Sequence, residues 1–266
     1  MIEAVETYPR LAEAAAALAR GGARFMAGGT VAMRDANYGR FGARRLVRTT
    51  DPAFRALSAQ GDRFEIGAGA TLAQVLESRE LAALHPVARL VGGPAVREAA
   101  TVGGNLFAPH PYGDFAAALL ALGAVARLAE GREMPLADLF AQRDRVGLVA
   151  SLTLQRPRRG EFGFRKLSRV KPKGVSVLSV AVKAPGAPSR VSGAAIAFAG
   201  MGPHPLRAAA AERALEGARL DPAGVAAACA AAAEGLSPPD DPLASAWYRA
   251  EVAGVQLRRC LLEDMA

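Results

Sequence analysis

Cysteine and histidine are both scarce in this chain of 266 residues, which contains two cysteines and three histidines. Cys229 and Cys260 stand apart and form no paired-thiol motif, which excludes an iron–sulfur cluster or a structural zinc site built by this chain alone. Each histidine precedes a proline, and none has the helical spacing of a zinc protease. We therefore expect no metal site.

The common nucleotide and nucleophile motifs are also missing. The sequence has no Gly-Lys dipeptide, which excludes a P-loop, and no Gly-x-Ser-x-Gly, which excludes a nucleophile elbow. Residues 67–69 begin like a Rossmann pattern, but Leu72 stands where the third glycine is required. No cluster of catalytic side chains can be named, so the chain needs a cofactor in order to react.

Long hydrophobic runs are absent as well. The longest, residues 115–126, is too short to span a bilayer. The N-terminus carries Glu3 and Glu6 where a signal peptide has a basic segment. We expect a soluble cytoplasmic protein without a membrane span.

The basic charge is concentrated in one segment. The formal net charge is +8, and eight basic residues with one acid lie between Arg156 and Lys173, so this segment holds +7 of the total. This concentration indicates a local contact with a phosphate or an acidic partner and argues against a nucleic-acid surface. A solvated basic linker is the alternative interpretation.

What the sequence does contain is an ordinary globular composition, with 51% hydrophobic and 22% charged residues. Its length predicts two domains. Residues 1–50 predict a small βαβ unit with a parallel sheet, and residues 51–157 predict a second part with strands and helices. Three strands followed by Ala-rich helices in residues 158–266 predict a separate α+β domain.

Two of four Gly-Gly pairs stand in places that suit an anion. Gly28-Gly29 follows a predicted strand and precedes a predicted helix, which leaves backbone N–H groups free to bind a diphosphate. Gly103-Gly104 offers a second such surface, with the Thr101 hydroxyl at one end and the Asn105 carboxamide at the other. A tight structural turn is the alternative for either pair.

Six segments, in this order and spacing, resemble the FAD-binding medium subunit of the molybdenum hydroxylases, the xanthine dehydrogenase and carbon monoxide dehydrogenase family. Two of them are Met-Ala-Gly-Gly-Thr-Val and Ala-Thr-Val-Gly-Gly-Asn. The segments are spread over nearly the whole chain, at residues 26–31, 66–72, 100–105 with 113–114, 164–169, 199–208 and 248–255.

The resemblance implies an α+β fold. It implies a two-part PCMH-type FAD-binding domain at residues 1–157, made of the small βαβ unit at 1–50 and a mixed or antiparallel sheet with helices at 51–157. A smaller α+β domain follows at residues 158–266.

The resemblance also implies a binding site for FAD. Asp114, after the second turn, inherits a role in holding the nucleotide, although an N-cap of the helix that begins at Phe115 is an equal alternative. Lys166 is the candidate that reaches the flavin, with Arg165 as its rival. The two Gly-Gly turns would grip the diphosphate through Met26, Ala27, Gly28, Gly29, Thr30, Val31, Thr101, Gly103, Gly104 and Asn105.

By the same resemblance, this chain works inside a larger oxidoreductase. A large subunit would oxidise the substrate at a molybdenum cofactor, and a small subunit with 2Fe-2S clusters would pass electrons to the FAD of this chain. NAD, oxygen or a quinone would be the terminal acceptor. Two alternatives remain open, namely a stand-alone FAD oxidase or reductase and a non-enzymatic docking subunit with purely structural glycines.

Overall fold

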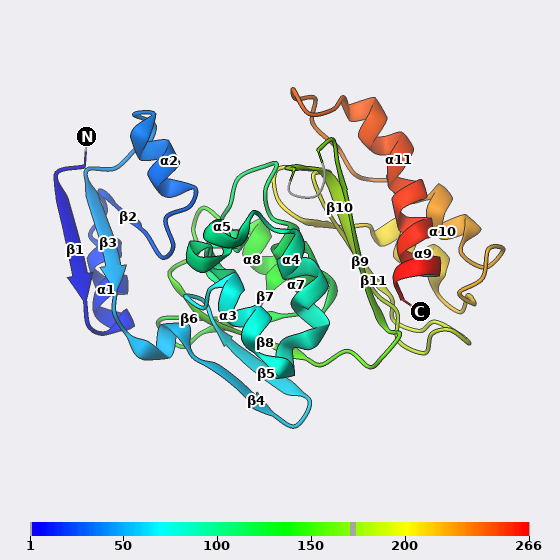
Figure 1. The fold of residues 1–266 in the computed structure, drawn as a ribbon, viewed down its shortest axis with the longest axis horizontal. Helices are drawn as coiled ribbons and strands as arrows, with labels where there is room; N and C mark the ends of the chain where they lie inside the picture. Colours follow the sequence, from blue (N-terminus) through cyan, green and yellow to red (C-terminus); the bar gives the residue numbers. More distant parts are fainter. Residues whose placement is uncertain (1, 171–173, 266) are drawn as a thin grey trace.

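The computed structural model describes residues 2–170 and 174–265, and three β-sheets follow one another along the chain (Figure 1). The first sheet is small and parallel, with the strand order β1-β3-β2. Its elements are β1 (Ala4–Tyr8), α1 (Leu11–Ala19), β2 (Ala23–Phe25), α2 (Ala32–Asn37) and β3 (Arg45–Thr49). Helix α1 packs on β3 through buried residues three positions apart, because that spacing places them on one face.

The second sheet is antiparallel and has the strand order β4-β5-β8-β6-β7. Its strands are β4 (Leu57–Gln60), β5 (Arg63–Gly67), β6 (Val125–Leu128), β7 (Glu133–Pro135) and β8 (Val149–Gln155). The helices of this part are α3 (Leu72–Glu77), α4 (His85–Leu90), α5 (Pro94–Ala99), α6 (Val102–Leu106), α7 (Asp114–Ala121) and α8 (Leu136–Ala141), with 3-10 turns at Pro52–Arg55 and Arg79–Leu84.

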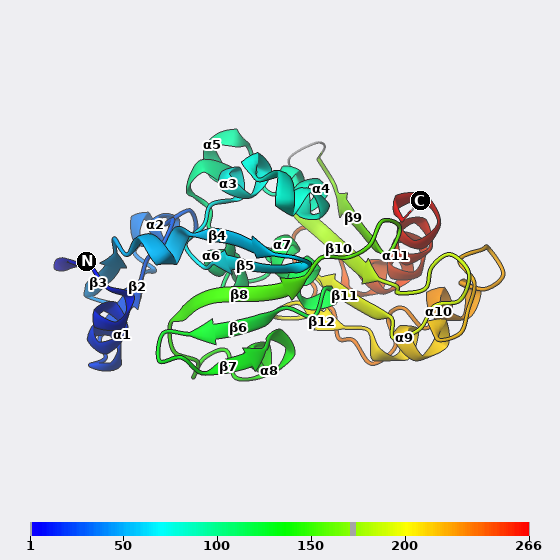
Figure 2. The ribbon, with the colours of Figure 1, turned by 90° about the horizontal axis from the view of Figure 1, so that it is seen from below.

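The third sheet is antiparallel and lies between two layers of helices (Figures 1 and 2). Helix α7 packs on one side of β10 and α11 on the other. Seven of the eight residues of β10 are buried, as expected for a strand covered on both faces. The elements of this part are β9 (Phe162–Ser168), β10 (Ser176–Lys183), β11 (Ala195–Ala199), β12 (Leu206–Arg207), α9 (Ala209–Leu215), α10 (Ala226–Ala230), α11 (Ala246–Arg259) and a π-helical turn at Cys260–Asp264.

Helix α7 forms the centre of the molecule. The apolar run that begins at Phe115 supplies it, and all eight of its residues are buried. The largest hydrophobic core contains this helix together with the second sheet, and it also includes Phe164, Ala181, Ala197 and Ala199 from the third sheet. The second and third sheets therefore share one core across α7.

The expected α+β class is confirmed, including the small βαβ unit and an antiparallel second sheet. The sequence analysis did not predict strand β1, which lies at the edge of its sheet and alternates between half-buried and exposed residues. An edge strand of this kind has few buried apolar residues, so its sequence shows little of the hydrophobic pattern by which strands are predicted. Within the described ranges, no helix combines the length and the apolar character that crossing a membrane requires.

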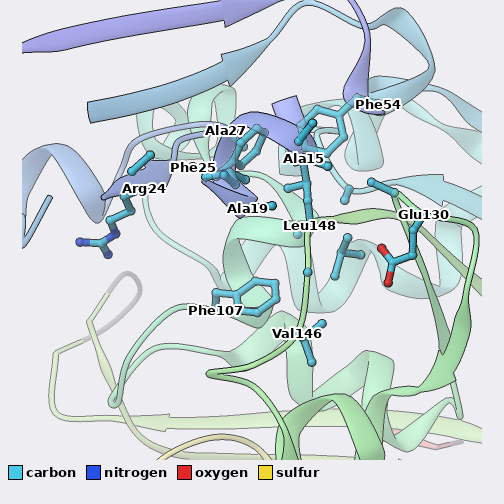
Figure 3. A pocket seen from close by; sticks show the side chains of 18 of the residues that line it. Ala15, Ala19, Arg24, Phe25, Ala27, Phe54, Phe107, Glu130, Val146 and Leu148 are labelled. Atoms are coloured by element: carbon cyan, nitrogen blue, oxygen red, sulfur yellow. The ribbon is translucent and has the colours of Figure 1, made fainter. Parts of the chain in front are cut away.

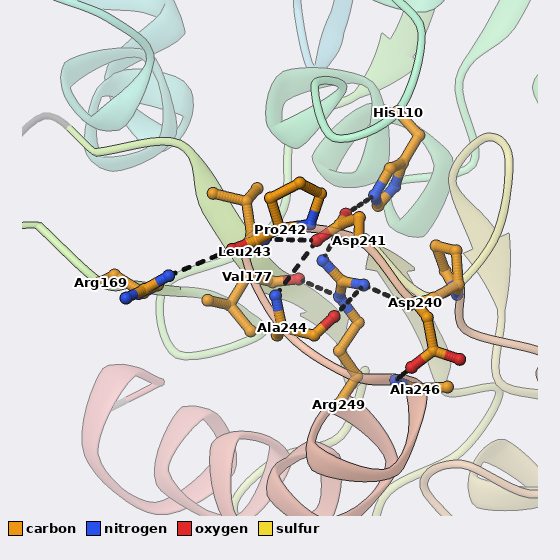
Figure 4. Close-up of polar contacts among 11 residues, drawn as sticks. His110, Arg169, Val177, Asp240, Asp241, Pro242, Leu243, Ala244, Ala246 and Arg249 are labelled. Atoms are coloured by element: carbon orange, nitrogen blue, oxygen red, sulfur yellow. Dashed lines mark hydrogen bonds and ion pairs between the residues drawn. The ribbon is translucent and has the colours of Figure 1, made fainter.

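A buried arginine ties the C-terminal helix to the rest of the chain (Figure 4). Arg249 of α11 is fully buried, and its Nε donates to the carbonyl of Val177 at 2.9 Å. Its Nη2 donates to the carboxylate of Asp241 at 2.7 Å, while Nη1 donates to the carbonyls of Pro239 and Ala244. The same oxygen, Oδ2 of Asp241, also lies 2.6 Å from Nε2 of His110.

The ionisation of Asp241 follows from these contacts. Burial opposes its charged form, but hydrogen bonds from His110, the backbone N–H of Ala244 and Arg249 outweigh that cost. They hold the pKa of this carboxyl well below its usual range. Because the pKa is lowered in the folded state, the stabilisation is present above the unfolded value of about 4 and is lost as the pH falls below it.

We expect Arg249→Met to lower the free energy of unfolding at pH 7 by about 3–5 kcal/mol, because it leaves the partly buried Asp241 carboxylate without its cation. Urea unfolding followed by circular dichroism measures this change. Arg259→Met, at an exposed position near the end of the same helix, is the matched control and should cost under about 1 kcal/mol. The difference between Arg249→Met and the unmodified chain should shrink at pH 3. Equal stability of the two variants at pH 7 would contradict this interpretation.

Candidate cofactor-binding site

The first Gly-Gly turn leaves a row of backbone donors free. It lies between the end of β2 at Phe25 and the start of α2 at Ala32, and Gly29 has a φ of +73°, which only glycine adopts easily. The N–H groups of residues 27–32 donate to no hydrogen-bond acceptor in residues 2–170 or 174–265. Consecutive free N–H groups at the start of a helix form a site for an anion.

The second turn is arranged differently. It opens helix α6, whose N-cap Thr101 accepts a hydrogen bond from the N–H of Gly104 at 3.0 Å. The N–H groups of Val102 and Gly103 donate to the carbonyls of Ala70 and Ala68, at 2.9 and 2.7 Å. These donors are therefore already used inside the protein. The turn can still provide a ligand with a glycine backbone surface free of side chains, which is exposed at Gly104.

The two turns are packed directly against each other. A Cβ on Gly28 would lie 1.6 Å from the carbonyl oxygen of Ala99 and 3.3 Å from Cγ2 of Thr101. A Cβ on Gly103 would lie 2.8 Å from the carbonyl oxygen of Ala68. Packing alone thus requires glycine at positions 28 and 103. Gly104, by contrast, is exposed to solvent. Gly29 is needed for another reason, since its left-handed conformation sets the direction of the free N–H donors.

A cavity of about 960 Å³ adjoins both turns and lies between α1 and residues 144–149 (Figure 3). Its volume is in the range of ligand pockets. Phe25 and Phe107 line it near the glycines, and alanine side chains of α1 line another part of its wall. Free N–H donors, a glycine cradle and an adjoining apolar cavity together fit a nucleotide that carries a diphosphate.

Asp114 and Lys166 lie together, as a buried ion pair. Lys166 Nζ lies 3.0 Å from Oδ2 of Asp114 and donates to the carbonyl of Leu90 at 2.9 Å. The hydroxyls of Ser176 and Ser179 donate to Oδ1 of the same carboxylate at 2.6 and 2.7 Å. Both charged side chains are less than a tenth exposed. The pair therefore joins the start of α7 to the third sheet.

The N-cap interpretation of Asp114 is wrong. The N-cap of α7 is Gly113, with a φ of 114°, and the carboxylate of Asp114 makes no cap hydrogen bond. The capping oxygen comes from Asn105, whose Oδ1 accepts the N–H of Ala116 at 2.9 Å. The carboxamide expected at the diphosphate thus has a structural contact that links the second turn to α7.

Strand β9 turns Lys166 and Arg165 to opposite sides, since neighbouring residues of a strand alternate. Arg165 Nε donates to Asp264 at 2.6 Å, and Nη2 donates to Glu263 at 2.8 Å. The hydrogen bond with Asp264 raises the pKa of Arg165 further above its ordinary value. Lys166 instead faces the second part of the chain, which contains the second Gly-Gly turn.

The basic segment is not one continuous docking surface. Arg165 and Lys166 are paired with acids inside this chain, and Arg156 stacks over the ring of Phe64 at 4.8 Å from its centroid. Arg169 donates to the carbonyl of Pro242 at 3.1 Å. Lys171 and Lys173 lie outside the described residues. The net charge of +7 expected for residues 156–173 is therefore partly neutralised by acidic side chains of the same chain.

Several residues at the site were missed by the sequence analysis. They are Arg24 and Phe25 before the first turn, Phe107 after the second, and the pair formed by Arg34 and Tyr112, whose Nη1 and hydroxyl lie 2.6 Å apart. All of them lie within eight residues of a Gly-Gly pair in the sequence. Proximity to the turns was the available signal, but the side chains themselves follow no known motif.

Two family matches cover most of the chain. Residues 5–154 match the family described as FAD binding domain in molybdopterin dehydrogenase, and residues 163–264 match CO dehydrogenase flavoprotein C-terminal domain. The chain therefore belongs to the FAD-binding family of the molybdopterin dehydrogenases. It is an oxidoreductase chain and its cofactor is FAD, which the free donors and the glycine cradle fit.

Individual relatives agree with this assignment. The carbon monoxide dehydrogenase medium chain of Afipia carboxidovorans is 28% identical over 215 residues, which are 76% of this chain and 74% of the relative. A carbon monoxide dehydrogenase structure from Hydrogenophaga pseudoflava superimposes with a TM-score of 0.87 at 26% identity, over 98% of this chain and 96% of that one. Quinoline 2-oxidoreductase from Pseudomonas putida 86 shares the fold, with a TM-score of 0.83 at 22% identity over 100% and 97% of the two chains.

We expect Gly29→Ala to weaken FAD binding about ten- to a hundredfold, because a side chain there disturbs the row of free N–H donors and costs charge-assisted hydrogen bonds. Gly39→Ala is the matched control, since Gly39 has a φ of +69°, close to the +73° of Gly29, and no atom near its added Cβ. Quenching of FAD fluorescence measures both affinities. If the two variants bound FAD equally well, the first turn would not be the cradle.

Proposed function

We propose that this chain is the electron-transferring FAD subunit of a heteromeric molybdenum hydroxylase. The observation that carries the proposal is the row of free N–H groups at residues 27–32, packed against a second glycine turn beside a cavity that Ala27 and Gly104 line. Membership of the FAD-binding family agrees with it. FAD supplies reversible electron transfer when it is bound, and the chain binds, orients and encloses it.

The binding residues are proposed to act in two ways. Residues 27–31 hold the diphosphate by backbone N–H groups, and Met26 packs beneath Gly29, with Sδ 3.0 Å from the Cβ position of that glycine. The second turn, through Thr101, Gly103, Gly104 and Asn105, supplies a rigid surface on which the diphosphate lies. The cavity between Phe25 and Phe107 gives apolar space to a ring system at one end of the cofactor.

Asp114 and Lys166 are proposed to act at the other end, near the flavin ring. Their ion pair stands where α7, the loop before it and the third sheet meet. A buried pair is screened by salt much less than an exposed charge. Lys166 would stabilise the anionic reduced flavin, and Asp114 would hold the ammonium group in place and moderate its effect.

Electrons must reach this chain from a partner. It contains only two cysteines, Cys229 and Cys260, and no thiol cluster that would carry a metal centre. Cys260 is fully buried, and burial raises the pKa of its thiol above the ordinary value. We propose a small subunit with 2Fe-2S clusters as the donor, a large subunit with the molybdenum cofactor as the site of substrate oxidation, and NAD, oxygen or a quinone as the acceptor.

Acid extraction and reconstitution test this function. The purified chain should release FAD and no FMN, because two turns enclose a diphosphate whereas FMN has one phosphate. The flavin-loaded chain alone should not oxidise carbon monoxide, an aldehyde or a purine, and turnover should appear only with both partner subunits. Release of FMN alone, or full turnover by the isolated chain, would overturn the proposal.

The ion pair between Asp114 and Lys166 predicts opposite shifts of the flavin midpoint potential when either charge is removed. Lys166→Gln removes a positive charge and should lower the midpoint potential of the flavin, whereas Asp114→Asn removes the opposing charge and should raise it. Redox titration with reference dyes, at low and high salt, measures both shifts, and neither should depend strongly on salt. Arg158→Gln, at an exposed site of the same basic segment, is the control. If neither variant moved the potential, the pair would be structural only.

A further inference from the structure

A single hydrogen bond joins the N-terminal unit to the rest of the protein beyond the linking residue Asp51. Within the described residues, the donor Nη1 of Arg34 and the hydroxyl of Tyr112, 2.6 Å apart, form the one hydrogen bond between residues 2–50 and residues 52–265. The guanidinium group also stacks over the ring of Tyr112, at 5.4 Å from its centroid. The two parts also touch where Phe25 packs edge-to-face on Phe54 and where the glycine turns approach closely.

This hydrogen bond joins the two segments that follow the Gly-Gly turns, and the space beside those turns is the proposed cofactor cleft. Arg34 belongs to α2, the helix that begins directly after the free N–H groups of residues 27–32. Side chains on a helix tilt toward its N-terminus, so the Arg34 side chain leans toward the end of α2 where those donors lie. Tyr112 lies in the loop of residues 107–113, which leaves the second Gly-Gly turn. The arginine side chain is 45% exposed, so the contact is open to solvent.

The two sides of the contact are anchored unequally. The loop of residues 107–113 is fixed at Ala108, whose carbonyl accepts from Arg143 at 3.1 Å, and at His110, which contacts Asp241 at 2.6 Å. Helix α2 has no buried residue and belongs to a unit with only a three-stranded sheet. Segments with few buried contacts open at the lowest free-energy cost. Helix α2 is therefore the side that moves.

We propose that Arg34 and Tyr112 form a strap that closes the cleft over the diphosphate of FAD and slows its release. The inference rests on the proposed function, because it needs FAD at the two turns. Arginine suits this position, since its planar group stacks on the tyrosine ring and keeps N–H donors for an anion. Tyr112 holds the guanidinium group above the cleft, and opening of the strap lets α2 move away from the second turn.

The rate of FAD release tests the strap. The flavin-loaded full chain is mixed with an excess of an FAD-trapping apoprotein, and release is followed by flavin fluorescence. Tyr112→Phe, which keeps the ring and removes the hydroxyl, should speed release about three- to tenfold, and Arg34→Met should speed it about tenfold or more. The rate of FAD association should stay within about twofold. Arg40→Met, which removes an equal charge from the same unit without touching residues 107–113, should change neither rate.

A double variant separates a strap from two independent contacts. If the pair acts as one unit, Tyr112→Phe adds nothing to the release rate of Arg34→Met. Release rates of both single variants within about twofold of the unmodified chain would overturn the strap, and so would full additivity in the double variant. Failure of the proposed function looks different, because the unmodified chain would then carry no FAD or Gly29→Ala would bind it as well as Gly39→Ala does.

Discussion

The close contact between Gly28 and the carbonyl of Ala99 is the constraint on which the arrangement of this protein depends. It brings together two turns that lie about seventy residues apart in the sequence, at a separation that no Cβ allows. Once that contact is fixed, the free donors of the first turn face the glycine surface of the second. The cavity beside them then has one wall from each unit, including Phe25 from the first and Phe107 from the second.

The two turns divide the work of binding. The N–H groups of the second turn donate to the hydroxyl of Thr101 and to the carbonyls of Ala68 and Ala70. These hydrogen bonds fix the backbone of the turn and the start of α6. The first turn keeps its N–H groups free and is held mainly by the close approach of Gly28. A rigid surface beside a preformed row of donors lowers the entropy that a ligand loses on binding, so affinity does not require many side-chain contacts.

The sequence predicted the parts of this site that depend on local order. Glycine pairs after a strand and before a helix indicate an anion site, and the six ordered segments indicate the family from the sequence alone. Alternation along β9 then separates Lys166 from Arg165, but only when the register of the strand is known. The serine partners of Asp114 could not be predicted from the sequence, because Ser176 and Ser179 lie 62 and 65 residues away in the chain and belong to no motif.

The shared burial of helix α7 limits how this protein can be truncated or recombined with its relatives. Its buried surface is shared, since the second sheet packs with it in the same core as Phe164 and Ala181 of the third. A chain cut near residue 157 would leave that apolar surface open to water and prone to association. The two family regions are thus consecutive in sequence but share one core, and we expect them to unfold together. Exchange of the C-terminal region between relatives requires compensating changes on α7.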